Sequence, residues 1–236
     1  MPARTQSLPV DGQPMDVYLS APEGPGPFPA VVVIQHAGGV DPFIRSICDR
    51  LAAAGYLAAA PDLYHRLPPH LEPSARRQQL KDAEIIADVN ATVDFLRQDP
   101  LADGARLGIL GFCMGGRVVY LMATVNPHFK AAVAYYGGNL MVPWGEGAEA
   151  PFARTRYLHC PLLFHFGEED PNPSLADMEK LDAELTRYDK PHEFYVYPRA
   201  GHAFMDFTNP QRYRKEAAEA SWPRTLDFLA RHLGAA

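Results

Sequence analysis

Short apolar runs alternate with longer segments of helical periodicity along most of the chain. The apolar runs are rich in Val, Ile, Leu and Ala and are bounded by Gly or Pro, which is typical of buried β-strands. They lie at residues 29–35, 56–60, 106–112, 131–137, 161–167 and 193–198. Between them, apolar side chains recur at three- and four-residue intervals, which predicts helices. The predicted helices lie at residues 43–54, 74–97, 113–125, 174–188 and within 211–233.

The alternation of strands with helices predicts an α/β fold with a doubly wound, mainly parallel sheet and helices on both faces. Residues 8–19 indicate an additional antiparallel hairpin at one edge, and the Pro- and His-rich residues 63–73 are expected to form a loop. No repeat or low-complexity tract interrupts the pattern. A length of 236 residues is ordinary for one such domain, so we expect a single domain over residues 1–236.

The composition argues against several kinds of partner. Hydrophobic residues make up 47% of the chain, charged residues 21%, and the formal net charge is −6, so no basic field favours nucleic acid. The longest apolar runs are too short to span a bilayer or to form a signal peptide, so we expect a cytoplasmic protein that does not enter membranes. The expected partner is a small molecule, and the expected assembly is a monomer or a small homo-oligomer.

Cys113 is one of three cysteines, and its surroundings single it out. It stands where a predicted strand ends and a predicted helix begins, within Gly111-Phe112-Cys113-Met114-Gly115-Gly116. This is the small-x-nucleophile-x-small pattern of a sharp turn, in which a Cβ at Gly111 or Gly115 would crowd a neighbouring strand or helix. A helix N-terminus lowers the pKa of such a thiol and stabilises a developing oxyanion. A dinucleotide-binding turn is less favoured, because G-x-G-x-x-G and an acidic ribose partner are absent.

His202 and a nearby carboxylate are the candidate partners of this thiol. His202 follows the last predicted strand, which places it at the same carboxyl edge of the sheet as Cys113. In α/β enzymes with this turn the acidic residue lies between nucleophile and histidine in sequence, and Glu168, Glu169 and Asp170 follow the penultimate strand there. Asp170 is preferred, because a short side chain suits a tight Gly turn followed by Pro. No metal is expected, because H-x-x-x-H, H-E-x-x-H and C-x-x-C spacings are absent.

Together these motifs resemble those of the dienelactone hydrolase family, also called carboxymethylenebutenolidases. The resemblance rests on residues 35–39 (QHAGG), 55–56 (GY), 61–64 (PDLY), 111–116 (GFCMGG), 135–137 (YYG), 167–170 (GEED) and 200–204 (AGHAF). It implies an α/β-hydrolase fold and cleavage of a lactone or ester without cofactor or metal. It also implies a catalytic triad of Cys113, Asp170 and His202, with the backbone amides of Ala37 and Met114 as the oxyanion hole.

The resemblance also suggests which side chains surround the substrate. Tyr64, Tyr136 and Phe204 are candidate pocket residues, and ordinary core packing explains the two tyrosines equally well. Two positions depart from the family pattern. His36 replaces a carboxylate that lies beside the resting thiol in the family, and the stretch with Asp206 replaces an arginine that binds a substrate carboxylate. Both departures change the charge that the site offers to a substrate.

A second class of function competes with hydrolysis. A degenerate hydrolase fold would serve as a ligand-binding or thiol-redox protein, with Cys113 oxidised rather than acylated. The complete set of Cys113, His202 and Asp170 favours a hydrolase. Cys48 and Cys160 are distant from Cys113 in sequence, so neither is indicated as a resolving thiol.

Overall fold

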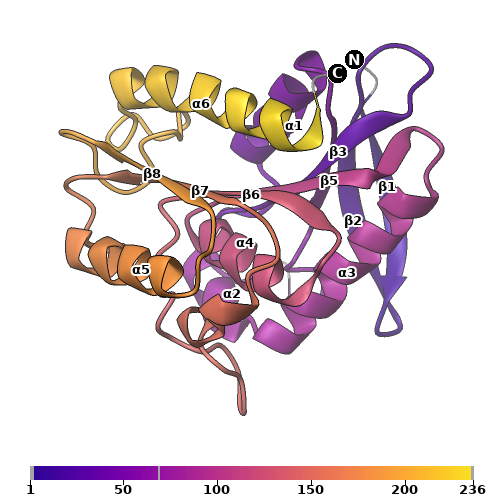
Figure 1. Ribbon diagram of the computed structural model, residues 1–236. Helices are drawn as coiled ribbons and strands as arrows, with labels where there is room; N and C mark the ends of the chain where they lie inside the picture. Colours follow the sequence, from indigo (N-terminus) through magenta and orange to yellow (C-terminus); the bar gives the residue numbers. More distant parts are fainter. Residues whose placement is uncertain (1–2, 69, 235–236) are drawn as a thin grey trace.

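The computed structural model describes residues 3–68 and 70–234 and is built on one eight-stranded sheet (Figure 1). The strands are β1 (Ala3–Val10), β2 (Gln13–Ser20), β3 (Phe28–Ile34), β4 (Leu57–Pro61), β5 (Ala102–Phe112), β6 (Phe129–Tyr135), β7 (Leu162–Gly167) and β8 (His192–Tyr197). Their order in the sheet is β1-β2-β4-β3-β5-β6-β7-β8, and β3 to β8 are parallel. The expected edge hairpin is present as β1 and β2, which extend beyond residues 8–19; the two strands pair antiparallel with each other, and β2 pairs antiparallel with β4.

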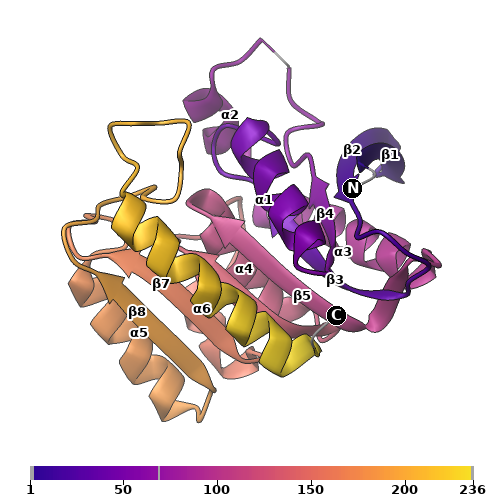
Figure 2. The same ribbon diagram turned by 90° about the horizontal axis from the view of Figure 1, so that it is seen from above.

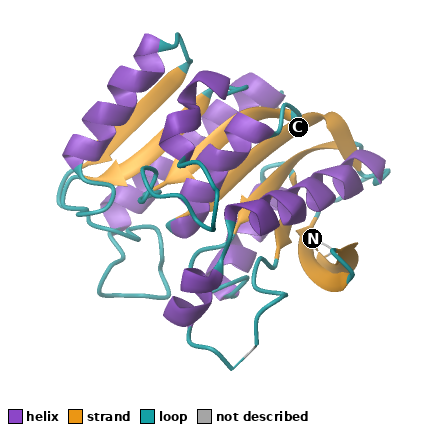
Figure 3. Cartoon of the chain, turned by 90° about the horizontal axis from the view of Figure 1, so that it is seen from below, coloured by secondary structure: helices purple, strands orange, loops and turns teal. Residues whose placement is uncertain are grey.

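Helices cover both faces of the sheet (Figures 2 and 3). They are α1 (Pro42–Ala53), α2 (Pro73–Gln79), α3 (Asp82–Gln98), α4 (Met114–Val125), α5 (Leu175–Arg187) and α6 (Lys215–Leu233), with a 3-10 helix η1 (Pro151–Tyr157). Helices α1 and α6 lie across one face, whereas α3, α4 and α5 cover the other. The predicted doubly wound α/β fold is therefore confirmed. Within the described ranges, no helix combines the length and the apolar character needed to cross a membrane.

Burial on both sides explains the continuous apolar runs. Val31 and Val33 of β3 share a core with α1 and α6, whereas Val32 and Ile34 share a core with α3 and α4. All four side chains are fully buried. A parallel strand covered on both faces has no solvent-facing side, so its sequence shows no polar alternation. The six predicted strands of this type all correspond to observed strands.

The prediction of one long helix after residue 73 is wrong, because two helices are present there. Periodicity predicts a single helix over residues 74–97, but the structure has two, α2 and α3, interrupted at Leu80. Leu80 is extended, with φ −67° and ψ 140°, and is buried in the core. The side chain of Asp82 pairs with Arg117, and its amide donates to the carbonyl of Trp144 at 2.8 Å. These tertiary contacts fix the start of a new helix at Asp82. They join residues that are distant in sequence, so the local hydrophobic periodicity does not reveal them.

The connection from β5 to α4 packs directly against the end of β3. A Cβ atom at Gly115 would lie 2.6 Å from the carbonyl oxygens of both Ile34 and Gln35, well inside van der Waals contact. A Cβ atom at Gly111 would meet the carbonyl group of Gly115 in the same way. The two glycines therefore let α4 begin beside the strand end with no space between them, as the sequence pattern predicts.

We expect Gly115→Ala to lower the free energy of unfolding by roughly 1–3 kcal/mol, because the added methyl group must displace backbone atoms. Gly201→Ala is the matched control, since the nearest atom to a Cβ there is 3.9 Å away. Its free energy of unfolding should change by less than about 0.5 kcal/mol. Urea denaturation followed by circular dichroism measures both variants, and equal midpoints would contradict this account of the packing.

Candidate active site

Cys113 occupies the predicted turn between β5 and α4. Its backbone has φ 57° and ψ −120°, a positive φ that residues with a side chain rarely adopt and that stores strain. Its amide donates to the carbonyl of Tyr135 at 3.0 Å, and its own carbonyl accepts from the amide of Gly116 at 3.0 Å. These bonds hold the thiol at the N-terminus of α4, at the carboxyl edge of the sheet.

His202 and Asp170 reach the same edge from neighbouring strands. Asp170 lies in the turn after β7, and His202 lies in the turn after β8. The Nδ1 atom of His202 is 2.9 Å from Oδ2 of Asp170, whose side chain has no exposed surface. The imidazole also interacts with the thiol of Cys113, and each group shifts the pKa of the other toward its charged form. The structure thus connects thiol, imidazole and carboxylate in series, while Glu168 and Glu169, the other two candidate carboxylates, are exposed.

Interactions within this series favour an ionised thiol. Burial alone would raise the pKa of Cys113, but the hydrogen bond and charge of His202, the backbone amide of Met114 and the charge of His36 bring it below its ordinary value. Burial alone would lower the pKa of His202, but its bonds to Asp170 and Cys113 raise it to about 10. Each group stabilises the charged form of the other. The geometry therefore supports a thiolate–imidazolium pair as the resting state.

The hydroxyl group of Tyr64 joins the loop after β3 to the turn that carries the thiol. It lies 3.1 Å from the carbonyl oxygen of Ala37 and 3.3 Å from Sδ of Met114. The backbone amide of Met114 lowers the pKa of the Cys113 thiol. The structure thus brings the two expected oxyanion-hole residues together beside the thiol, with a buried tyrosine between them.

His36 forms a second imidazole–carboxylate pair at this edge. Its Nε2 atom is 2.8 Å from Oδ2 of Asp41, the residue that caps the N-terminus of α1. Strands β3 and β5 are parallel neighbours in which Ile34 pairs with Gly111. His36 and Cys113 both stand two residues beyond that pair, so the register carries them to the same edge.

Asp206 adds a further negative charge near His36. It is buried, and its Oδ1 atom accepts hydrogen bonds from the amide and hydroxyl of Thr208 at 3.0 and 2.6 Å. Burial alone would lower the pKa of His36, but the hydrogen bond to Asp41 and the charges of Asp41, Asp206 and Cys113 raise it. The carboxylate of Asp206 therefore favours the charged form of His36.

Tyr136 and Phe204 support the imidazole of His202 from the core. The Tyr136 ring makes edge contacts with the rings of His202 and Phe204, each at 5.2 Å between centroids. Phe204 is fully buried and Tyr136 is 1% exposed. Both side chains therefore pack under the site in this structure, which matches the core-packing interpretation of Tyr136.

A cavity of about 360 Å³ opens beside the imidazole. Asp170 and His202 line it together with Arg212 and Arg214. The last helix, predicted within residues 211–233, is α6 from Lys215, so the two arginines lie in the loop that precedes it and line the cavity. Among the described residues, no three His, Cys, Asp or Glu side chains are grouped so that they could hold a metal ion.

Comparison with known proteins identifies the family. The sequence model of the dienelactone hydrolase family matches residues 15–233. The chain belongs to the dienelactone hydrolase family. It is therefore a hydrolase of the lactone and ester class, and the resemblance that the motifs indicate is confirmed.

Relatives of this dienelactone hydrolase family member match it over most of its length. A Methylorubrum extorquens protein named "Putative carboxymethylenebutenolidase" is 34% identical over 233 residues, which cover 95% of this chain and 79% of that protein. A Bradyrhizobium protein named "Probable 2-oxo-3-(5-oxofuran-2-ylidene)propanoate lactonase" is 30% identical, with 94% of this chain and 92% of that protein covered. The crystal structure of a "Putative Dienelactone Hydrolase" from Klebsiella pneumoniae is similar with a TM-score of 0.90 at 34% identity, and the match covers 98% of each chain.

We expect limited iodoacetamide treatment to alkylate Cys113 at least about tenfold faster than Cys48 or Cys160. The pKa of Cys113 is lowered, whereas burial raises the pKa of Cys48 well above its ordinary value and that of Cys160 to about 12. Peptide mass spectrometry over a time course gives the three rates. In the urea-unfolded control the three thiols should react at similar rates. Preferential labelling of a core cysteine in the folded protein would refute the expectation.

Proposed function

We propose that the chain hydrolyses a lactone or carboxylic ester through an acyl-thioester on Cys113. His202 is the general acid and base, and Asp170 orients the imidazole. The observation that carries the proposal is the 2.9 Å contact between His202 and Asp170 at the edge of the sheet that also carries Cys113, whose pKa His202 lowers. Family membership supplies the reaction class.

Acylation starts from the thiolate–imidazolium pair. The sulfur of Cys113 attacks the carbonyl carbon, a C–S bond forms, and the π electrons of the carbonyl move to its oxygen. When this intermediate collapses, the C–O bond to the leaving group breaks. His202 gives its proton to the departing alkoxide or enolate, which in a lactone remains attached to the acyl group.

Deacylation runs the same groups in reverse. Neutral His202 removes a proton from water as the water oxygen adds to the thioester carbonyl. The C–S bond then breaks, the product leaves as a carboxylic acid, and the thiolate–imidazolium pair is restored. Asp170 stabilises the imidazolium in both half-reactions, because its buried carboxylate stays bonded to Nδ1.

The backbone amides of Met114 and Ala37 are the proposed donors to the oxyanion. The Met114 amide stabilises negative charge on the sulfur of Cys113, so it is placed to stabilise the negative oxygen that forms next to that sulfur in the tetrahedral intermediate. Tyr64 holds the Ala37 segment against the same turn through the 3.1 Å contact with the Ala37 carbonyl. Donors fixed before the reaction lower the barrier most, and loss of one typically costs about a hundred- to a thousandfold in kcat.

A thiol-redox function is less well supported. Reversible oxidation of Cys113 would need a second thiol to resolve the sulfenic acid. Cys48 and Cys160 are free but buried, and burial raises the pKa of both. Neither is therefore a suitable resolving thiolate in the folded protein.

His36 has a proposed role beside the triad. The imidazolium of His36, held by Asp41, stabilises the thiolate of Cys113 with a second positive charge. His36 faces the negative groups of Asp41, Asp206 and Cys113, all of which favour its charged form. A histidine at this position therefore contributes the charge opposite to that of the family's carboxylate.

The test of the main proposal is a burst assay with a chromogenic short-chain ester. We expect a burst of leaving group equal to the enzyme concentration, because the acyl-thioester accumulates when deacylation is slower than acylation. In Cys113→Ala the burst should disappear and kcat/KM should fall by at least about a thousandfold. Cys160→Ala is the control and should retain both. Turnover that survives in Cys113→Ala would rule out the cysteine mechanism.

For His36→Gln we expect the acid limb of the Cys113 alkylation rate to move to higher pH. The pKa of His36 is raised, so its charge is present at low pH and is lost as the pH rises through that value. Alkylation should therefore slow about three- to tenfold near pH 5 and change little near pH 9. Asp41→Asn preserves the helix cap and should shift the limb less, in the same direction. Identical pH profiles for all three proteins would exclude this role.

A further inference from the structure

A buried arginine on α4 anchors the β6–η1 loop. Arg117 has no exposed surface and forms a bidentate pair with Asp82, with Nη1–Oδ1 and Nη2–Oδ2 distances of 2.6 and 3.0 Å. Its Nη2 and Nε atoms also donate to the carbonyls of Val142 and Asn139 at 2.6 and 3.3 Å. The guanidinium lies 3.8 Å from the centroid of the Trp144 ring. Because separating a buried ion pair is costly, these contacts fix the loop to α4.

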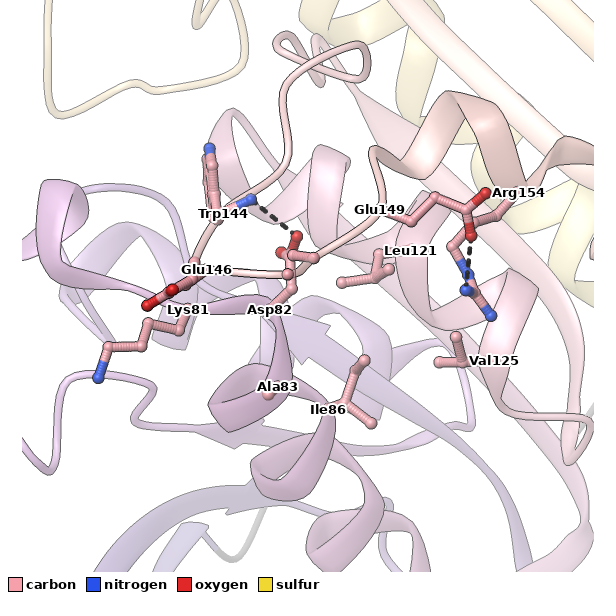
Figure 4. Close-up of a pocket in the computed structure, with 13 residues that line it drawn as sticks. Lys81, Asp82, Ala83, Ile86, Leu121, Val125, Trp144, Glu146, Glu149 and Arg154 are labelled. Atoms are coloured by element: carbon pink, nitrogen blue, oxygen red, sulfur yellow. Dashed lines mark hydrogen bonds and ion pairs between the residues drawn. The ribbon is translucent and has the colours of Figure 1, made fainter.

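Figure 4 shows the cavity next to these contacts, with Asp82 and Trp144 among the residues that line it. Asp82, at the start of α3, accepts a hydrogen bond from the Trp144 amide at 3.0 Å, and a cavity of about 480 Å³ lies beside them. On the rim of the cavity, Arg154 is paired with Glu149 at 3.1 Å. Both oxygens of Asp82 are already bonded within the anchor, so its charge is used to hold the loop.

The same loop is joined to the turn that carries Asp170. The backbone amide of Asn139 donates to Oδ1 of Asn172 at 3.0 Å, and Nδ2 of Asn172 donates to Oδ1 of Asn139 at 3.1 Å. We call this reciprocal pair the Asn139–Asn172 clasp. Gly138 makes room for it, since a Cβ atom there would overlap the Asn172 side chain. Asn139 has φ 57°, a conformation that asparagine adopts more readily than most residues.

The clasp ends one contact away from the triad imidazole. The backbone amide of Asn172 donates to Oδ1 of Asp170 at 2.9 Å, while Oδ2 of the same carboxylate is 2.9 Å from His202. A carboxylate is planar and rigid, so the partner of one oxygen sets the direction of the other. A shift of the Asn172 backbone would therefore turn the carboxylate relative to the imidazole.

We propose that the Asn139–Asn172 clasp, anchored on Arg117, is a positioning element that fixes the orientation of the Asp170 carboxylate toward His202. Asn172 lines the cavity beside His202, but its bond to the site runs to Asp170, so we infer that the clasp acts through Asp170. Its effect on turnover rests on the proposed function, whereas its effect on the charge state of Cys113 does not.

The sign of the effect follows from the charges of the series. A misoriented Asp170 stabilises the His202 imidazolium less, so the pKa of His202 falls from its raised value and the pKa of Cys113 rises toward its ordinary one. The thiolate–imidazolium pair then exists over a narrower pH range. In a plot of the amount of this pair against pH, the acid limb moves to higher pH and the alkaline limb moves to lower pH.

The experiment uses Asn172→Ala and Asn139→Gly in the full chain, and glycine keeps the positive φ at that position. We expect kcat for the chromogenic ester to fall about ten- to a hundredfold, with KM changed by less than about threefold, because the reacting groups lose their alignment. The acid limb of Cys113 alkylation should move to higher pH. In the double variant the losses should not add, because Asn139→Gly removes one of the two hydrogen bonds that Asn172→Ala removes.

Asn90→Ala is the matched control. Asn90 forms another amide pair, with Asn126 at 2.8 Å, at the opposite end of α4. Loss of the Asn90–Asn126 contact should lower the free energy of unfolding but leave kcat and the alkylation profile unchanged. If Asn172→Ala lowers only the unfolding midpoint and leaves kcat and the alkylation profile unchanged, the clasp has no positioning role. The pH profile of Cys113 alkylation requires no turnover, so it tests the clasp even if the proposed function is wrong. The proposed function is tested separately, by the ester burst in Cys113→Ala.

Discussion

The site depends on one close contact, between the first turn of α4 and the carbonyl groups at the end of β3. Two glycines permit it, and the helix axis is fixed as a result. That axis sets the position of the Cys113 thiol and directs the Met114 amide toward it. One turn further along, it carries Arg117 to the β6–η1 loop. The Cys113 thiol and the loop that reaches the Asp170 carboxylate are thus placed by the same packing constraint.

Around the thiol, acidic and basic groups alternate. Asp170 contacts His202, Asp41 contacts His36, and both imidazoles interact with the thiol of Cys113. Each imidazole therefore has an acidic group on either side of it. Interactions of this kind are stronger where water is partly excluded. The arrangement explains why the thiol and both imidazoles shift toward their charged forms.

The sequence predicts the strands, the nucleophile turn and the family because each leaves a local signature, whether an apolar run, a glycine pattern or a short motif. It predicts contacts between distant segments poorly. The helix break at Leu80 follows from the Asp82–Arg117 pair, whose members are 35 positions apart. The Asn139–Asn172 clasp likewise joins two loops, and asparagine in a loop is too common to attract notice. Sequence placed His202 correctly at the carboxyl edge, since the end of a strand fixes that position whatever the loop does.

The positive φ of Cys113 also limits which nucleophiles this backbone can carry. Side chains branched at Cβ are severely disfavoured in that conformation, whereas unbranched ones tolerate it at a modest cost. Serine and cysteine therefore fit the turn, and threonine does not. A single codon change could exchange sulfur for oxygen at the reacting atom without moving the helix, the glycines or the histidine. The turn at residue 113 therefore restricts the branching of the side chain more strictly than it restricts whether the side chain carries sulfur or oxygen.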